Sequence, residues 1–215
     1  MAAEPEPVLR IVRSEAERAV TDVTAGTSGR LSTRQAARHL SDEVVAAAKA
    51  GETAAWEAAF LTYGRELKGF LMVRLQDRED AEEAFSETFL RAIDRSGSLR
   101  KHSADAFRAW LYRIARNVAT DRLRVRGRLV YLADPPDSAD LLLGDCDDAM
   151  VASEESAAVR CAFAELPRDD QEVLWLRQCA GLSSQEVGAV VGKRPSAVRM
   201  QQQRALIALS RRLEL

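Results

Sequence analysis

Apolar residues recur at spacings of three and four along most of the chain, which is typical of amphipathic helices. Ser41 and Asp42 resemble an N-cap that opens a short helix ending at Gly51. The strongest pattern follows in a second predicted helix, whose large apolar positions are Trp56, Phe60, Tyr63, Leu67, Phe70 and Leu71. No segment alternates with period two for long enough to require a sheet, so the predicted fold class is all-α.

Two more helices are predicted at 77–93 and 107–124, separated by a loop at 95–105 that contains Gly and Ser and has no periodicity. The first has acidic residues in its opening turns, which suits the positive end of the helix dipole. Its apolar face consists of Ala81, Ala84, Phe85, Thr88, Phe89 and Ile93. The second is expected to bury Phe107, Trp110, Leu111, Ile114, Val118 and Leu123.

The C-terminal part is predicted to form four helical segments at roughly 151–165, 168–180, 184–191 and 195–213. The last two have the layout of a helix-turn-helix, with Ser183 or Ser184 as the cap, Gly192 at the turn and Pro195 in the first turn of the final helix. The expected inward positions are Val187, Val190, Val191, Val198, Ala205, Leu206, Leu209 and Leu213.

The outward side of the final helix pairs Arg and Gln with small residues, which is chemically suited to reading base edges in a major groove. Arginine prefers guanine there and glutamine prefers adenine. Lys193 and Arg194 would lie over phosphates at the start of the helix. The other predicted contacts are Ser196, Arg199, Met200, Gln203 and Arg204. The alternative is that these polar residues form the solvated face of an ordinary surface helix.

Charge is unevenly distributed, although the 31 Lys and Arg nearly balance the 33 Asp and Glu of this 215-residue chain. Residues 97–128 are strongly basic, 133–155 contain no Lys or Arg, and 193–212 are basic again. Two basic segments separated by an acidic one predict two surfaces for polyanions. The length fits two small domains of ordinary size.

Composition argues against several classes of protein. The three cysteines have no CxxC or Cys/His spacing, so neither a disulfide framework nor a zinc site is expected. The two histidines, His39 and His102, have no Cys or acidic partner at ligand spacing, and no phosphate-binding glycine loop is present. The start of the chain lacks a signal-peptide core, and no uninterrupted apolar run reaches about 18 residues. We therefore expect a cytoplasmic protein without cofactor or catalytic activity.

Arginines alternate with aromatic residues in the predicted helix 107–124. This arrangement is able to hold phosphates while bases stack on rings, as proteins that bind single strands do. The alternative is that Trp110 belongs to the core and that the arginines only solubilise the helix; for Trp110 alone, the core interpretation is favoured.

Two long motifs give the chain a family resemblance covering about residues 41–213. DREDAEEAFSETFLRAI, followed by FRAWLYRIARNVATDRLR, resembles region 2 of the extracytoplasmic-function sigma factors of the sigma-70 family. LPRDDQEVLWLRQCAGLSSQEVGAVVGKRPSAVRMQQQRALIAL resembles their region 4. The implied organisation is an N-terminal extension at 1–40, region 2 at 41–128, an acidic flexible linker at 129–152 and region 4 at 153–215.

The resemblance implies a role in promoter recognition and melting by core RNA polymerase. It implies that the β′ clamp coiled coil of the polymerase contacts Asp80, Glu83, Phe85, Glu87, Thr88 and Leu90. The residues implied to hold the melted minus-ten element are Arg100, Lys101, Arg108, Trp110, Arg113, Arg116, Asn117 and Arg122. Region 4 is implied to read the minus-thirty-five element as duplex, and the implied partners include the β flap and an anti-sigma factor.

Two other functions remain open from the sequence. An autonomous helix-turn-helix regulator would bind duplex DNA without polymerase and would need no role for residues 77–93. A sigma-like decoy would occupy an anti-sigma factor, but such decoys usually come with a receiver domain, which this chain lacks. The Arg and aromatic residues in both predicted DNA surfaces also argue against a decoy.

Overall fold

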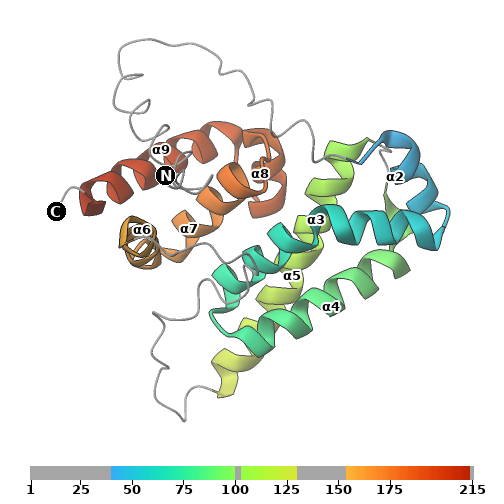
Figure 1. The fold of residues 1–215 in the computed structure, drawn as a ribbon, viewed down its shortest axis with the longest axis horizontal. Coiled ribbons are helices and arrows are strands. Elements are labelled where there is room, and N and C mark those ends of the chain that lie inside the picture. Colours follow the sequence, from blue (N-terminus) through green and yellow to red (C-terminus); the bar gives the residue numbers. More distant parts are fainter. Residues whose placement is uncertain (1–39, 100–102, 130–153, 214–215) are drawn as a thin grey trace, which may run out of the picture.

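The computed structural model describes residues 40–99, 103–129 and 154–213, and these ranges contain helices and no strand (Figure 1), which confirms the all-α prediction. Most of the predicted acidic linker and nearly all of the extension lie outside them. A 3₁₀ turn at Ser96–Ser98 falls in the predicted loop, and a π-type turn at Trp175–Cys179 extends α7. The α-helices are α2 (Asp42–Lys49), α3 (Thr53–Leu75), α4 (Arg78–Asp94), α5 (Ala104–Leu129), α6 (Glu154–Ala164), α7 (Arg168–Leu174), α8 (Ser184–Val191) and α9 (Pro195–Leu213).

Short polar side chains fix the starts of several helices, as the sequence predicts. Ser41 caps α2 by accepting from the Val44 amide at 3.3 Å. Asp77 caps α4 in the same way, accepting from the Asp80 amide at 2.9 Å. At α8 the cap is Ser183, which forms a capping box with Glu186.

Helices α2–α5 pack around an aromatic core, in which Phe70 and Tyr112 make an edge-on contact with ring centroids 5.4 Å apart. The expected apolar faces of α3, α4 and α5 are largely buried. The prediction was wrong for Phe60 and Ile93, which are 49% and 43% exposed. Phe60 lies over Phe85 and Phe89, at centroid distances of 5.3 and 5.2 Å, but its outer side faces solvent.

Helices α6, α7 and α9 share a second, smaller apolar cluster, and α8 and α9 form the predicted helix-turn-helix. Gly192 has φ 75°, a left-handed conformation that glycine adopts without strain and that ends α8. A Cβ on Gly188 would lie 2.5 Å from the Lys193 carbonyl oxygen, so a glycine here lets the turn approach α8 closely. Leu213, expected inward, is 39% exposed because the helix ends there.

The two helical modules pack directly on each other. Helices α7 and α8 lie against α3 and α5 (Figure 1), and a single apolar cluster includes residues from both modules. From the C-terminal module it contains Val173, Leu176, Ala180, Leu182, Val187, Val190 and Val198. The structure is therefore a closed form, in which one module covers part of the other.

Candidate nucleic-acid interface

Helix α9 exposes a continuous polar face. One side of the helix is buried, so the opposite side faces solvent. The buried residues are Val198, Ala205, Leu206 and Leu209. Residues three and four apart are neighbours on a helix, so the side chains on that face form one stripe. The predicted contacts that the structure exposes there are Arg194, Ser196, Arg199, Met200, Gln203 and Arg204.

Lys193 differs from the other predicted contacts because it is half-buried and already bonded. Its Nζ donates to Gln201 Oε1 at 2.8 Å and lies 3.2 Å from Asp169 Oδ2. Gln201 in turn donates to Asp170 Oδ1 at 2.8 Å. This network links the turn before α9 to α7, so Lys193 serves as a support for the turn in the closed form.

Helix α5 presents arginines that are paired with carboxylates. Arg108 lies 3.4 Å from Asp105 and 3.5 Å from Glu186 of α8. Arg116 donates from Nε to Glu172 of α7 at 2.8 Å. Thus carboxylates of the C-terminal module contact two of the predicted minus-ten arginines.

The remaining predicted minus-ten residues have different surroundings. Arg113 and Asn117 are exposed on α5, whereas Trp110 is 7% exposed and packs on Phe107 at a centroid distance of 5.8 Å. Trp110 is thus a core residue in the closed form, in agreement with the core interpretation that the sequence favours for this residue alone. Arg100 and Lys101 lie outside the described residues.

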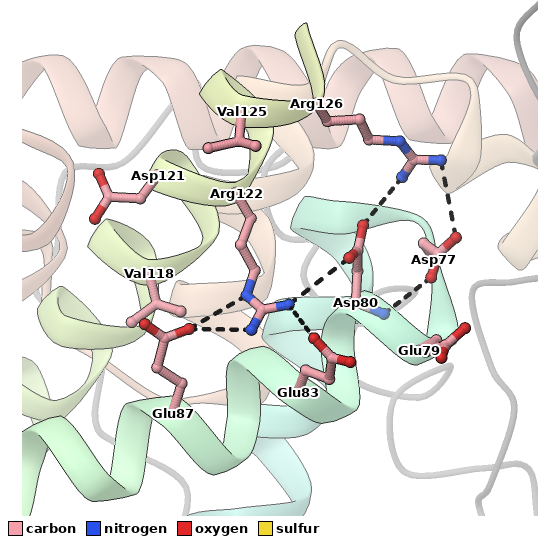
Figure 2. Close-up of a pocket in the computed structure, with 10 residues that line it drawn as sticks. All are labelled: Asp77, Glu79, Asp80, Glu83, Glu87, Val118, Asp121, Arg122, Val125 and Arg126. Atoms are coloured by element: carbon pink, nitrogen blue, oxygen red, sulfur yellow. Dashed lines mark hydrogen bonds and ion pairs between the residues drawn. The ribbon is translucent and has the colours of Figure 1, made fainter. Parts of the chain in front are cut away.

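Carboxylates of α4 face arginines of α5 across an open cleft of about 520 Å³ (Figure 2). Arg122 donates to Glu83 at 2.8 Å and to Glu87 at 3.0 Å, and it lies 3.7 Å from Asp80. Burial alone would lower the pKa of Arg122, but the hydrogen bonds that it donates to Glu83 and Glu87, together with their negative charges, outweigh burial and raise this pKa. Arg126 approaches Asp80 at 3.3 Å. The acidic face of α4 is consequently held in place by α5.

The uncharged residues predicted to contact the polymerase are divided between surface and core. Leu90 is 64% exposed, so its side chain is available on the surface of α4. Phe85 is half-buried against Phe89. Thr88 is fully buried, and its hydroxyl donates to the Ala84 carbonyl at 2.6 Å, so its side chain is not part of the surface of α4 in this structure.

Comparison with known proteins adds independent findings. Residues 59–129 match Sigma-70 region 2, and residues 156–209 match Sigma-70 region 4. The chain is 30% identical over 186 residues to the RNA polymerase sigma-H factor of Pseudomonas aeruginosa, covering 80% of this chain and 93% of that protein. It belongs to the sigma-70 family.

The curated relatives also place it in the extracytoplasmic-function branch of these transcription initiation factors. The sigma factor BldN of Streptomyces coelicolor is 34% identical over 172 residues, a match that spans 80% of this chain and 65% of BldN. Among solved structures, CnrH bound to the cytosolic domain of CnrY has a TM-score of 0.58 at 24% identity, covering 80% of this chain and 96% of that one. RpoE of Bartonella quintana, bound to the anti-sigma factor NepR, has a TM-score of 0.62 at 21% identity, with 74% and 96% covered. Both share the fold.

The described residues of this sigma factor form neither a membrane-spanning helix nor a metal-binding cluster. No helix there is both long and apolar enough to cross a bilayer. No group of three or more His, Cys, Asp or Glu side chains is placed to hold a metal ion within the same ranges.

Sequence reasoning missed the residues that join the two sigma modules. Trp175 donates its indole N–H to the Glu66 carbonyl at 3.0 Å and covers Gly69 of α3. Glu172 of α7 accepts hydrogen bonds from arginines of α3 and α5, one of them Arg74. The one available signal is a glycine in the middle of a long helix, which usually has a packing reason.

The cysteines supply a chemical reporter of this interface. Cys179 is half-buried, and its burial raises the pKa of the thiol to about 12, whereas Cys161 is exposed. Alkylation requires the thiolate, whose fraction at pH 8 is roughly one in 10⁴ for such a pKa. We expect iodoacetamide at pH 8 to modify Cys161 at least tenfold faster than Cys179, measured by peptide mass spectrometry. Equal rates would show that α7 and α3 separate freely in solution.

Proposed function

We propose that this sigma factor confers promoter specificity on core RNA polymerase, without catalysis of its own, by contacting both halves of a promoter. The exposed polar stripe of α9, set behind a capped α8 and a tight glycine turn, is the observation that best supports it. A helix in this setting is able to enter a major groove and read base edges. In this proposal region 4, residues 153–215, binds the minus-thirty-five element and the β flap.

Region 2, residues 41–128, is proposed to bind the polymerase through α4. Asp80, Glu83 and Glu87 form an acidic face beside the exposed Leu90, and this combination suits a basic helical partner with an apolar position. The proposed partner is the clamp coiled coil of β′. Arg122 is ion-paired with two of these carboxylates, which orients them on the face before docking.

The same region is proposed to hold the melted non-template strand along α5 and the loop before it. Of the predicted minus-ten residues that the structure describes, Arg113 and Asn117 are the ones exposed to solvent on this helix. Single strands are bound through phosphate contacts and stacking, so these side chains need no duplex to act on. The acidic linker, 129–152, connects the two regions.

An anti-sigma factor is a further candidate partner, since CnrH and RpoE were both solved in complexes and RpoE's partner is an anti-sigma factor. We place the protein in the cytoplasm, where its polymerase is. We assign no role to the extension at 1–40.

The deciding experiment is run-off transcription with purified core polymerase on a pool of genomic fragments from the source organism. Addition of the sigma factor is expected to yield transcripts with shared sequence motifs upstream of their starts. A pull-down of core polymerase is run in parallel. Failure to bind core enzyme, with no inhibitor present, would contradict the proposal.

An autonomous duplex-binding regulator is the second candidate, favoured by the exposure of α9 in the closed form. It needs no polymerase-binding face on α4. Specific footprints on duplex DNA by the protein alone, without any binding of core polymerase, would support it over the sigma role.

Base reading by α9 can be tested at one position. Arg199→Ala is expected to relax selection at one position of the minus-thirty-five element at a cost of about 1–3 kcal/mol, because an arginine pairs bidentately with guanine. Promoter libraries randomised in that element, transcribed with each variant, measure the change. A uniform loss on all sequences would instead identify a phosphate contact.

A further inference from the structure

A buried carboxylate from region 4 lies between two arginines of region 2. Glu172 has a side chain that is 2% exposed, and each of its oxygens accepts from a different helix. Oε2 accepts from Arg74 Nη1 of α3 at 2.8 Å, and Oε1 accepts from Arg116 Nε of α5 at 2.8 Å. Two guanidinium groups therefore converge on one anion.

Contacts within region 2 position Arg74 beside the backbone of Arg116. Arg74 donates from Nη2 to Thr120 Oγ1 at 3.2 Å, and Thr120 donates to the Arg116 carbonyl at 2.7 Å. The edge-on contact of Phe70 with Tyr112 fixes α3 against α5 nearby. These contacts hold the Arg74 guanidinium and the backbone of Arg116 near each other when region 4 moves away, because none of them involves region 4.

Geometry requires region 4 to move away when the promoter is bound. The minus-ten and minus-thirty-five elements lie about 25 base pairs apart, which is roughly 85 Å of duplex at 3.4 Å per base pair. A compact chain of this length has a radius of gyration of about 17 Å, so its closed form is too small to reach both elements. Glu172 must then leave Arg74 and Arg116.

Removing the carboxylate leaves two like charges side by side, which is unfavourable unless another anion replaces it. Arginine binds phosphate with the same planar donor geometry that it uses for carboxylate. Arg116 also follows Arg113 and precedes Asn117, the exposed positions proposed to face the melted strand. A backbone phosphate of that strand is therefore the ligand that this site fits.

We propose that Arg74 and Arg116 form a phosphate-binding site for the non-template strand, which Glu172 occupies as an internal mimic in the closed chain. This proposal rests on the proposed sigma function and adds Arg74, a residue of α3, to the DNA-binding surface. It also explains how the closed form withholds region 2 from DNA: α7 places a carboxylate where the phosphate binds. Arg74 Nε, which is buried without a hydrogen-bond partner here, is a donor that such a ligand is able to use.

The test measures binding of a fluorescent 25-nucleotide oligo-dT to the full-length chain by anisotropy, without polymerase. Glu172→Gln removes the charge with little change of shape, and Trp175→Ala removes the indole that closes the interface. Each variant is expected to bind at least tenfold more tightly than the wild type. Adding Arg74→Ala to either one is expected to abolish the gain and to lower the slope of log K against log salt by about 0.7, the value for one phosphate on a single strand.

Arg211→Ala, added to the same backgrounds, is the matched control, because it removes one exposed positive charge from α9 without touching the site. It is expected to change binding less than twofold. The proposal is overturned if Arg74→Ala has no larger effect than Arg211→Ala, or if both opened variants bind no better than the wild type.

Core polymerase binding by the same preparations separates this proposal from the sigma function. If the chain binds core polymerase but Arg74→Ala does not change oligo-dT binding by the opened variants, the phosphate site is rejected and the sigma function is kept. If the opened variants bind oligo-dT more tightly and this gain depends on Arg74, but the chain does not bind core polymerase, the proposed sigma function is rejected. Region 2 then keeps a single-strand binding site.

Discussion

Replacing Glu83 and Glu87 together by lysine is expected to lower promoter-directed run-off transcription about 100- to 1000-fold. Both carboxylates lie on the α4 face proposed to meet the clamp coiled coil, and like charges across an interface cost several kcal/mol. The substitution also opposes Arg122, which donates to both carboxylates in the free protein. Core-binding affinity, measured by fluorescence with labelled protein, is expected to fall in parallel with transcription.

A matched variant separates this effect from net charge. Glu43 and Glu57 are exposed on α2 and α3, so Glu43→Lys with Glu57→Lys changes the net charge equally and is expected to preserve core binding within about twofold. The milder pair Glu83→Gln and Glu87→Gln avoids new repulsion with Arg122. Full transcription by the lysine variant, at normal helicity, would instead favour the autonomous regulator.

The helices of both modules could be predicted because each has its own local signals. The cap at Ser41, the glycine turn at Gly192 and the Pro195 start lie where the sequence places them, since caps and turns depend on neighbours in the chain. The prediction was wrong for Phe60 and Ile93 because their burial depends on packing between helices and not on neighbours in the chain. Periodicity identifies the apolar face of a helix, but not how far along that face another element reaches.

The contacts between modules could not be read from the sequence. Arg74 and Glu172 are 98 residues apart, and each looks like an ordinary charged position on an amphipathic helix. The family resemblance assigns Arg122 to DNA, whereas the structure pairs it with the carboxylates of α4. Charge patterns along a chain identify polyelectrolyte surfaces, but pairing between elements depends on tertiary packing.

Gly69→Leu is expected to open the closed form. A Cβ on Gly69 would lie 2.2 Å from Cζ2 of the Trp175 ring, far inside contact distance, so the indole must move out of its place over α3. Leucine favours the helix over glycine by about 1 kcal/mol, so α3 itself is not weakened. Alkylation of Cys179 at pH 8 is expected to rise at least tenfold, together with hydrogen exchange in α7 and α8.

Gly127→Leu makes the same substitution on α5, where a Cβ would meet no atom within 4 Å, and it is expected to leave Cys179 protected. Core polymerase should bind the Gly69 variant more tightly than the wild type, since a ligand that binds the open form no longer has to separate the modules. Continued protection of Cys179 in Gly69→Leu would mean that Trp175 rearranges within a closed interface. The closed form would then depend on the Glu172 ion pairs rather than on the fit of the indole over glycine.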